Sequence, residues 1–462
     1  MKRALVYGLA ITGEAVAAGL LAHGYDIVVA DDQPTPVRVA AADRLGTELI
    51  GAPEIDEIAR LMESCDLVCP APGVPENHDV IRAAVAGGVP VVTELDLAYE
   101  WEADRPGGPR PMLAVTGTDG KTTTTMLVAA MVRAAGRRAA EVGNTEVPLV
   151  AALDTDAEVF VVECSSFRLN WLRSFRAESS VWLNLAPDHQ NWHSSMAAYE
   201  SSKSRLWSHL RSTDTAIGNI DDEVVMRNLA RVHARRRTFG GADADYRLEG
   251  DALVGPAGEI TTTAQMARAL PHDVANALAA AAVVLEAGLA DTAAVRQALA
   301  SFDHPPHRIE LVGEAGDVRW YNDSKATTPH AALTAIRGFD HIVLLAGGRN
   351  KGLDLASLAT EHERVVGVVG LGEAGTEIAE SFAPYCPVRV ASSMAQAVEL
   401  AAAMAEPGDV VLLSPACASF DWYPDGGYPA RGEEFKHLVM KRLQASSGSS
   451  PRTDDAAERS DR

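Results

Sequence analysis

Short apolar runs alternate with alanine-rich or amphipathic segments along most of the chain. Near the start, the apolar residues of 4–10 and 26–30 predict two buried strands, and segment 14–23 between them predicts a helix. The pattern continues with a strand, a helix and a strand, predicted at 67–73, 79–87 and 89–94. Strands that alternate with helices in this way are typical of an open, mostly parallel α/β sheet.

Two segments rich in proline, glycine or charge interrupt this alternation. Segment 102–111 predicts a linker, and the sequence HPPHR at 304–308 marks a second break. Between the breaks, strands are predicted at MLAVTG, EVFVVE and SSVWLNLA. Two helical patterns, at 272–288 and 292–302, then close this second α/β unit.

A predicted hairpin over 308–323 opens a third unit, in which HIVLLAGG, VVGVVGLG, PVRVASS and DVVLLSPACAS predict strands between helices. The fold class is therefore α/β, with three domains predicted at 1–104, 112–304 and 305–445. The segment 446–462 is rich in serine, proline and charge, and we predict a disordered tail there.

Composition narrows the possible function classes. The 462 residues carry 41 basic and 63 acidic side chains, a net charge of −22, which disfavours general binding to nucleic acid or anionic membranes. Five cysteines without a CxxC pair indicate a reduced, cytoplasmic protein. The start, MKRALVYGLAITG, could be a signal peptide, but Glu14 and the strand-like DIVVA favour a buried first strand. No apolar run reaches the roughly 18 residues of a membrane span.

The segment TGTDGKTTTT at 116–125 is the strongest candidate for chemistry. It follows a predicted strand and precedes a predicted helix, so Gly117 and Gly120 allow the backbone to approach a phosphate closely. Lys121 can reach phosphate oxygens, and Thr122 offers a hydroxyl to magnesium. The strict phosphate-loop pattern fails because Val115 stands where it requires glycine. The alternative is a plain glycine turn with a solvated lysine.

Other candidates lie where predicted strands end. Glu163 ends EVFVVE and is a potential magnesium ligand, with a helix-start acid as the alternative. Asp31 stands where a ribose-binding acid would lie, although Ala10 breaks the dinucleotide-binding glycine pattern. His189 could meet a metal or be structural. Thr328 before Pro329 is a helix cap, but capping does not explain Asp323 and Lys325 together.

Taken in order, these segments resemble the Mur ligase family, whose members use ATP to add amino acids to the peptide stem of the peptidoglycan precursor. The resemblance covers residues 3–442 and rests on TGTDGKTT, VGNTEVP, ECSSFRL, NLAPDH, HDVANALAA, HRIE, NDSKATT and LLSPACASF. It implies a Rossmann-like first domain that holds the UDP part of the substrate, a central phosphate-loop ATPase domain, and a Rossmann-like third domain for the incoming amino acid. It further implies that D-glutamate is added to UDP-N-acetylmuramoyl-L-alanine through an acyl phosphate.

The resemblance also implies roles for individual residues. The catalytic group comprises Lys121, Asn144, His189 and Lys203. The ATP contacts are Gly117, Thr118, Asp119, Gly120, Lys121, Thr122, Thr123, Asn276, Arg308 and Asp323. The ligands of two magnesium ions are Thr122, Glu163, His189 and Lys203, with Lys203 carbamylated. The UDP-substrate contacts are Ile11, Thr12, Asp31, Gly73, Asn144, Ser165 and Arg168. The glutamate contacts are Lys325, Thr327, Lys351, Ser419, Phe420 and Tyr428. A cytoplasmic monomer without nucleic-acid or membrane partners is expected.

The chain departs from the family pattern at Asp119, Arg168, Asn191 and Gln33, where asparagine, glutamine, aspartate and a basic residue are usual. Three alternatives therefore stay open. One is another Mur-type or folylpolyglutamate-type amide ligase, or a variant with another acceptor or glutamate stereochemistry. The second is an NAD(P)-dependent oxidoreductase, against which Ala10 speaks. The third is a non-catalytic nucleotide-binding regulator.

Overall fold

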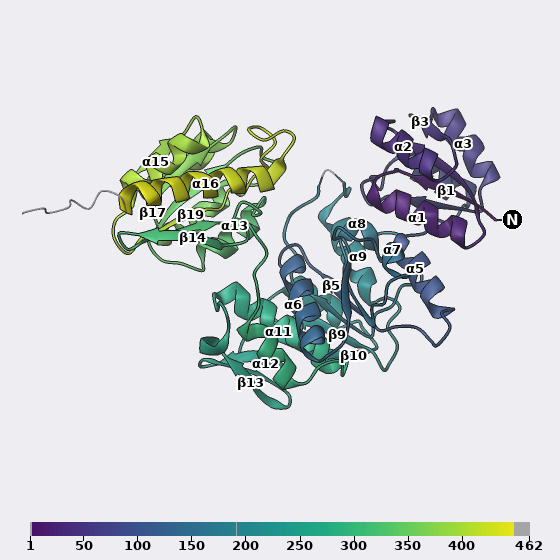
Figure 1. The fold of residues 1–462 in the computed structure, drawn as a ribbon, viewed down its shortest axis with the longest axis horizontal. Helices are drawn as coiled ribbons and strands as arrows, with labels where there is room; N and C mark the ends of the chain where they lie inside the picture. Colours follow the sequence, from purple (N-terminus) through teal and green to yellow (C-terminus); the bar gives the residue numbers. More distant parts are fainter. Residues whose placement is uncertain (1, 191, 448–462) are drawn as a thin grey trace, which may run out of the picture. The chain divides into compact units, whose positions relative to one another are not determined.

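Three β-sheets organise the chain in the computed structural model, which describes residues 2–190 and 192–447 (Figure 1). The chain divides into two units, one up to Asp303 and one from His304 onward. The first unit contains two of the sheets and the second contains one. The predicted break at 304–308 thus falls beside the division between the units.

A four-stranded parallel sheet with the order β3-β2-β1-β4 begins the first unit. Its strands are β1 (Arg3–Tyr7), β2 (Asp26–Asp31), β3 (Leu49–Gly51) and β4 (Leu67–Pro70). Its helices are α1 (Ile11–Ala22), α2 (Pro36–Arg44), α3 (Ile55–Ser64) and α4 (Asp79–Gly87). A Cβ on Gly13 would lie 1.8 Å from the carbonyl oxygen of Gly8. Because only glycine fits there, α1 starts directly against the end of β1.

The second sheet of this unit has nine strands in the order β13-β12-β11-β10-β9-β8-β5-β7-β6. They are β5 (Met112–Thr116), β6 (Ala139–Gly143), β7 (Val159–Glu163), β8 (Ser179–Trp182), β9 (Thr215–Asn219), β10 (Arg235–Gly240), β11 (Tyr246–Glu249), β12 (Ala252–Gly255) and β13 (Gly258–Thr262). Neighbouring strands pair in parallel from β6 to β11, and only the two pairings that involve β12 are antiparallel.

Alternating residues of this sheet face two different cores. Leu113 and Val115 pack with the helices on one face, whereas Met112 and Ala114 belong to a core that also contains Val6 of β1. The first two sheets therefore share apolar contacts within one unit. The remaining helices of the unit are α5 (Glu94–Ala103), α6 (Lys121–Ala134), α7 (Leu149–Ala152), α8 (Ser166–Leu169), α9 (Met196–Ser204), η1 (Arg205–Trp207), α10 (Glu223–Leu229), η2 (Thr263–Gln265), α11 (Pro271–Glu286) and α12 (Thr292–Ala300).

The predicted linker at 102–111 is anchored rather than free. Arg110 is buried, and its guanidinium pairs with the Glu102 carboxylate at 2.6 Å and lies 4.4 Å from the centre of the Phe160 ring. The same guanidinium donates to the carbonyls of Leu153, Thr155 and Ala157. The first two residues of the predicted linker belong to helix α5, and the rest connects α5 to β5 within one unit. Composition carried no signal of this buried arginine.

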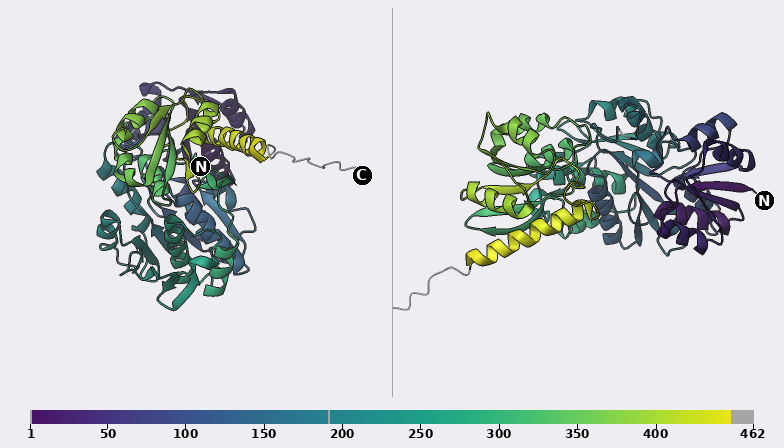
Figure 2. Two further views of the ribbon diagram at one scale, coloured as in Figure 1. Left: turned by 90° about the vertical axis from the view of Figure 1, so that its left-hand side faces the viewer. Right: turned by 90° about the horizontal axis from the view of Figure 1, so that it is seen from above.

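The second unit holds a six-stranded sheet with the order β14-β15-β19-β16-β17-β18. Its strands are β14 (Glu310–Ala315), β15 (Val318–Asn322), β16 (Ile342–Gly347), β17 (Val365–Leu371), β18 (Val388–Val390) and β19 (Val410–Leu413). Its helices are α13 (Pro329–Ile336), η3 (Ala356–Arg364), α14 (Gly375–Phe382), α15 (Met394–Met404) and α16 (Gly427–Ser447). The predicted hairpin is β14–β15, which pair antiparallel. Figure 2 shows α16 as one long helix of this unit.

Several predicted bounds differ from those in the structure; for example, the strand predicted at 67–73 ends at Pro70. The strand predicted at 89–94 is reduced to a single bridge between Val91 and Val68, because α5 begins at Glu94. Helix α16 continues to Ser447, so the first two residues of the predicted tail are helical, and 448–462 lie outside the described residues. Within the described part of the chain, no helix is both long and apolar enough to cross a membrane.

Candidate active site

The predicted phosphate loop connects the end of β5 to the start of α6. Gly120 stands at the N-cap with φ +81°, a left-handed conformation that favours glycine. A Cβ there would lie 2.7 Å from the side-chain oxygen of Asn276 on α11. Asn276 also accepts a hydrogen bond from the Thr124 hydroxyl at 3.3 Å. The loop therefore presents the first N–H groups of α6 beside a residue that was predicted to contact ATP.

Asn184, which follows β8, fixes the loop from the other side. Its side-chain oxygen accepts hydrogen bonds from the N–H groups of Thr118 and Asp119, both at 2.9 Å. The buried Thr118 hydroxyl lies 3.1 Å from the hydroxyl of Tyr199. Asn184 was not among the predicted site residues. The signal available for it was its place directly after a strand, inside the motif NLAPDH.

Two lysines converge on one carbonyl of this loop. Lys121 donates to the carbonyl oxygens of Gly117 at 2.9 Å and Thr118 at 2.7 Å. Lys203 on α9 donates to the same Gly117 oxygen at 2.6 Å and is only 1% exposed. Burial, followed by the charge of Lys121, holds the pKa of the Lys203 amine well below its usual range. Two residues 82 positions apart thus meet at the loop.

A carboxylate stands at the carboxyl end of β7, beside the loop strand β5. Glu163 is buried, and its Oε1 accepts a hydrogen bond from the Asn144 side chain at 3.0 Å. Its Oε2 is buried without a hydrogen-bond partner. A buried carboxylate oxygen needs a donor or a cation, so Glu163 fits a magnesium ligand.

The other predicted metal ligands lie in the same unit. His189 has a left-handed backbone, φ +55°, and its ring nitrogen lies 3.2 Å from the Asp188 carboxylate. Thr122 is half-buried in the first turn of α6, and Thr123 is buried. Within the described residues, no group of three or more histidine, cysteine, aspartate or glutamate side chains is arranged to hold a metal. A metal at Glu163 would therefore depend on other groups, such as phosphate oxygens or water, for most of its ligands.

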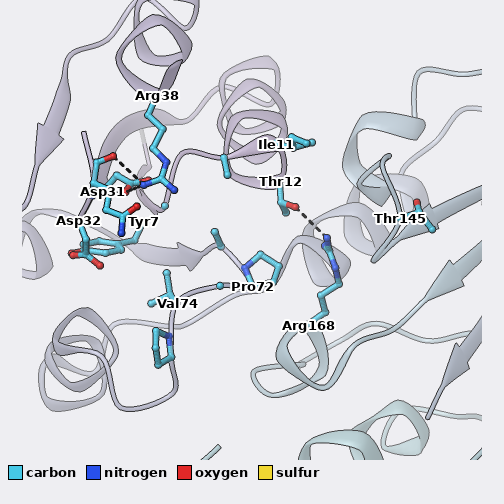
Figure 3. A pocket seen from close by; sticks show the side chains of 16 residues that line it. Tyr7, Ile11, Thr12, Asp31, Asp32, Arg38, Pro72, Val74, Thr145 and Arg168 are labelled. Atoms are coloured by element: carbon cyan, nitrogen blue, oxygen red, sulfur yellow. Dashed lines mark hydrogen bonds and ion pairs between the residues drawn. The ribbon is translucent and has the colours of Figure 1, made fainter. Parts of the chain in front are cut away.

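A pocket of about 450 Å³ lies above the carboxyl edge of the first sheet (Figure 3). Five predicted UDP-substrate residues line it: Ile11, Thr12, Asp31, Gly73 and Arg168. Asn144 does not line it, although its neighbour Thr145 does, and Ser165 instead caps α8 by accepting from the Arg168 N–H at 3.4 Å. Sequence reasoning missed Arg38, which also lines the pocket.

Arg168 links this pocket to the interior of the unit. The side chain is 5% exposed, and its guanidinium pairs with the buried Glu94 at the start of α5. It also donates to the Thr12 hydroxyl at 3.1 Å, as the dashed line in Figure 3 marks. The arginine that departs from the family pattern thus pairs with a buried acid and lies at the pocket wall, while its Nε is buried without a hydrogen-bond partner.

The buried His193 links the segment that contains His189 to Glu76, which follows the pocket residue Pro75. His193 lies with Nε2 2.9 Å from the Ser166 hydroxyl and Nδ1 3.3 Å from the Glu76 carboxylate. Burial lowers the pKa of His193, and its contact with Glu76 opposes that shift. Glu76 also accepts from the Ser194 N–H at 2.7 Å. The nearby Asn191 lies outside the described residues.

The second unit contains the other predicted contacts. Asp323 is fully buried at the end of β15, where its carboxylate accepts from the Ser414 hydroxyl at 2.8 Å and the Ile309 N–H at 3.3 Å. Its neighbour Ser324 accepts from Arg431 at 2.9 Å, and burial lowers the pKa of that guanidinium to about 10. The side chains of Ser414 and Arg431 therefore hold the segment that follows β15 in place.

The residues predicted to bind glutamate differ in burial. The Lys325 amine lies 6.0 Å from the centre of the Tyr428 ring. Ser419 is buried, whereas Phe420 is 51% exposed. Arg308 and Thr327 are half-buried, and Lys351 is exposed. The structure therefore brings Lys325 and Tyr428 near each other.

Comparison with protein families accounts for most of the chain. Residues 2–93 match the description "Mur ligase MurD-like, N-terminal domain", residues 115–284 match "Mur ligase middle domain", and residues 307–417 match "Mur ligase, glutamate ligase domain".

Curated relatives match over nearly their whole length. The UDP-N-acetylmuramoylalanine--D-glutamate ligase of Frankia casuarinae is 39% identical, covering 95% of this chain and 94% of the relative. The enzyme of the same name from Thermobifida fusca is 36% identical, covering 95% and 98%.

Solved structures share the fold at low identity. A pseudomurein peptide ligase type C from Methanothermus fervidus has a TM-score of 0.60 at 15% identity and covers 96% of this chain and 100% of its own. The UDP-N-acetylmuramate-alanine ligase of Thermotoga maritima has a TM-score of 0.56 at 21% identity, with coverages of 96% and 100%.

Proposed function

This chain belongs to the Mur ligase family, and from that premise we propose that it is an ATP-dependent ligase that adds D-glutamate to UDP-N-acetylmuramoyl-L-alanine during peptidoglycan precursor synthesis. The observation that carries the proposal is the meeting of Lys121 and Lys203 at the Gly117 carbonyl. Relatives named as D-glutamate ligases over nearly the whole chain supply the substrate identities. The cytoplasm, where such a nucleotide-linked substrate is handled, is the expected location, and a monomer is the expected state.

Amide formation from a carboxylate needs a better leaving group than oxide. We assign ATP to the loop 117–123, so that its γ-phosphoryl group passes to the L-alanyl carboxylate and ADP remains. The amine of D-glutamate then attacks the acyl phosphate, inorganic phosphate leaves, and one proton is lost from the nitrogen. Lys121 is placed to exchange its two carbonyl contacts for phosphate oxygens, because it already stands at the start of α6. Catalysis of this kind relies on positioning and charge neutralisation.

Magnesium would be held by Glu163, Thr122 and His189, and when bound it would neutralise phosphate charge. The unpaired Oε2 of Glu163 supports the first of these assignments. A Lys203 carbamate would supply the carboxylate for a second ion. Its support is the buried amine with a lowered pKa, since carbamylation needs a neutral amine. Asn144 would orient Glu163 through their 3.0 Å bond.

For the substrate, we assign the UDP part to the pocket around Thr12, Asp31 and Arg168. Ile11 is 68% exposed and offers an apolar surface in this pocket. Gly73 lines the same pocket without a side chain. In the second unit, Lys325 and Lys351 are assigned to the carboxylates of glutamate, with Thr327, Ser419, Phe420 and Tyr428 around it. Arg308 and Asn276 are assigned to ATP. Asp323 would act on ATP only indirectly, because its carboxylate is buried against Ser414 and Ile309.

The deciding experiment measures phosphate release by the purified protein with ATP, magnesium and UDP-N-acetylmuramoyl-L-alanine, comparing D-glutamate, L-glutamate and no amino acid. We expect release that depends on D-glutamate, with a product heavier by one glutamyl residue in mass spectrometry. Equal release with L-glutamate, or none with either isomer, would contradict the assignment. The same assay with a UDP-N-acetylmuramoyl-glycine acceptor tests the acceptor residue.

A further inference from the structure

At the acidic end of the substrate pocket, the buried Asp31 has little unused acceptor capacity. Asp31 accepts from the Leu9 N–H at 2.7 Å through Oδ2, and from the Gln33 N–H at 2.8 Å through Oδ1. Its neighbour Asp32 accepts from the Tyr7 hydroxyl at 2.6 Å and lies 3.1 Å from the His78 ring nitrogen. A carboxylate offers about four lone-pair directions, so the protein occupies most of those of Asp31 but leaves part of those of the 55% exposed Asp32 open.

The third partner of Asp31 is an arginine from a different element. Arg38 on α2 donates from one terminal nitrogen to Asp31 Oδ1 at 2.5 Å and to the Gln33 carbonyl at 3.0 Å. Its side chain is 26% exposed and lines the pocket, and Asp31 beneath it is 6% exposed. In Figure 3 the Arg38 guanidinium points toward Asp31, at the opposite end of the pocket from Thr12 and Arg168.

We propose that Arg38 reads the nucleobase of the substrate, and that Asp31 serves mainly to hold Arg38 in place. This inference rests on the proposed function, which supplies a uridine diphosphate. The phosphates belong at the start of the 12-residue helix α1, where Ala10 provides no side-chain cap for the first N–H groups. The base then reaches the Arg38 end of the pocket.

The chemistry of that end predicts which base is preferred. Arginine can only donate hydrogen bonds, and most of the acceptor directions of Asp31, the acid that it contacts, are already occupied. Uracil presents a carbonyl oxygen at its fourth ring position, which accepts from a guanidinium. Cytosine presents an amino group there, which would place donors against donors. Arg38 is therefore a specificity-determining residue for the pyrimidine.

The test is calorimetric titration of the full-length protein with UDP and with CDP, which needs no catalysis. We expect the wild type to bind UDP more tightly than CDP. Arg38→Met should weaken UDP binding about tenfold or more, the scale of one charged hydrogen bond, while CDP binding changes little. Asp31→Asn should give a smaller loss in the same direction. Arg44→Met is the matched control, because Arg44 also lies on α2 and pairs with an acid, Glu14, away from the pocket.

The outcomes separate this inference from the function on which it rests. If the wild type binds neither nucleotide, the proposed function fails at this pocket. If it binds UDP and Arg38→Met binds UDP equally well, or loses UDP and CDP by the same factor, the role of Arg38 in reading the base is overturned. Thermal unfolding of each variant shows whether a loss of binding reflects loss of fold.

Discussion

Lys121 is the residue with the most direct consequence for turnover. Its amine is held over the loop by two carbonyls, ready to meet phosphate oxygens. Lys121→Ala should lower kcat by at least about 100-fold, the cost of losing one dedicated electrostatic contact. Steady-state phosphate release measures this, with Arg133→Ala, which lies on the same helix but pairs with Glu141, as the control. Near-normal turnover of Lys121→Ala would contradict the mechanism.

Lys203 allows a chemical test of its proposed modification. Lys203→Ala removes the buried amine that reaches Gly117, and activity should be lost. Because a carbamate is a carboxylate on a stem, millimolar short-chain carboxylic acids should restore part of the activity by binding in the vacated space. A fully active Lys203→Ala variant without added acid would rule out the carbamate role, and mass spectrometry of the intact wild type would detect the modification directly.

His193 should make part of the stability depend on pH. Burial lowers its pKa below the usual 6.5, so the folded state favours the neutral ring. Its contribution to stability is therefore present above pH 6.5 and is lost as the pH falls through the lowered folded pKa. Denaturant titrations from pH 7.5 to 5 should show a shallower acid loss for His193→Gln than for the wild type. The exposed His209→Gln serves as control, and an unchanged slope for His193→Gln would refute the effect.

At the scale of elements, the turn into α6 can be tested against a matched turn. Gly120 and Gly136 both have φ +81°, but a Cβ at Gly120 would meet Asn276 at 2.7 Å, whereas one at Gly136 meets nothing within 4 Å. Each alanine substitution should cost about 1 kcal/mol of stability through the backbone. Only Gly120→Ala should also weaken ATP binding, since it displaces Asn276. Equal ATP affinities in the two variants would show that the loop tolerates the displacement.

Sequence reasoning was most successful for elements with continuous apolar runs. β5, β7 and β16 are buried on both faces, so their continuous apolar runs predict strands without knowledge of the neighbouring strands. The prediction of a strand at 89–94 was wrong because Thr93 and Asp96 form a capping box that starts helix α5 at Glu94. The residues before it have the composition of a strand. Pairing depends on the neighbouring chain, which composition does not show.

The candidate site was less legible than the fold. Lys121 and Glu163 could be singled out because Lys121 follows a strand and Glu163 ends one, and parallel strands bring their ends together. Arg38 was missed because it lies in the first turn of a helix, seven residues after the acid that it contacts. Nothing in the local sequence distinguishes it from Arg44 on the same helix, which faces away from the pocket.

For the whole molecule, the division at Asp303 predicts where a ligand should stabilise the structure. UDP at a hundred times its Kd stabilises the fold that binds it by about 2.7 kcal/mol. Hydrogen exchange should therefore slow in β1, β2 and α1, and should remain unchanged in β16 and β17. Equal protection of both units would mean that they unfold together. ATP provides the comparison, because the loop that we propose to bind it connects β5 to α6.

Helix α5 limits how such an enzyme could be recombined with a relative. Its Asp96 carboxylate accepts from the N–H groups of Arg173, Ser174 and Phe175 in the nine-stranded part of the unit, and its last turn carries the Glu102 that pairs with Arg110. A hybrid joined within 104–111 would take α5 from the relative together with the first sheet. The contacts of Asp96 and Glu102 with the rest of this chain would then be lost. The junction that preserves them precedes Glu94, so the exchangeable module is shorter than the proline-glycine segment suggests.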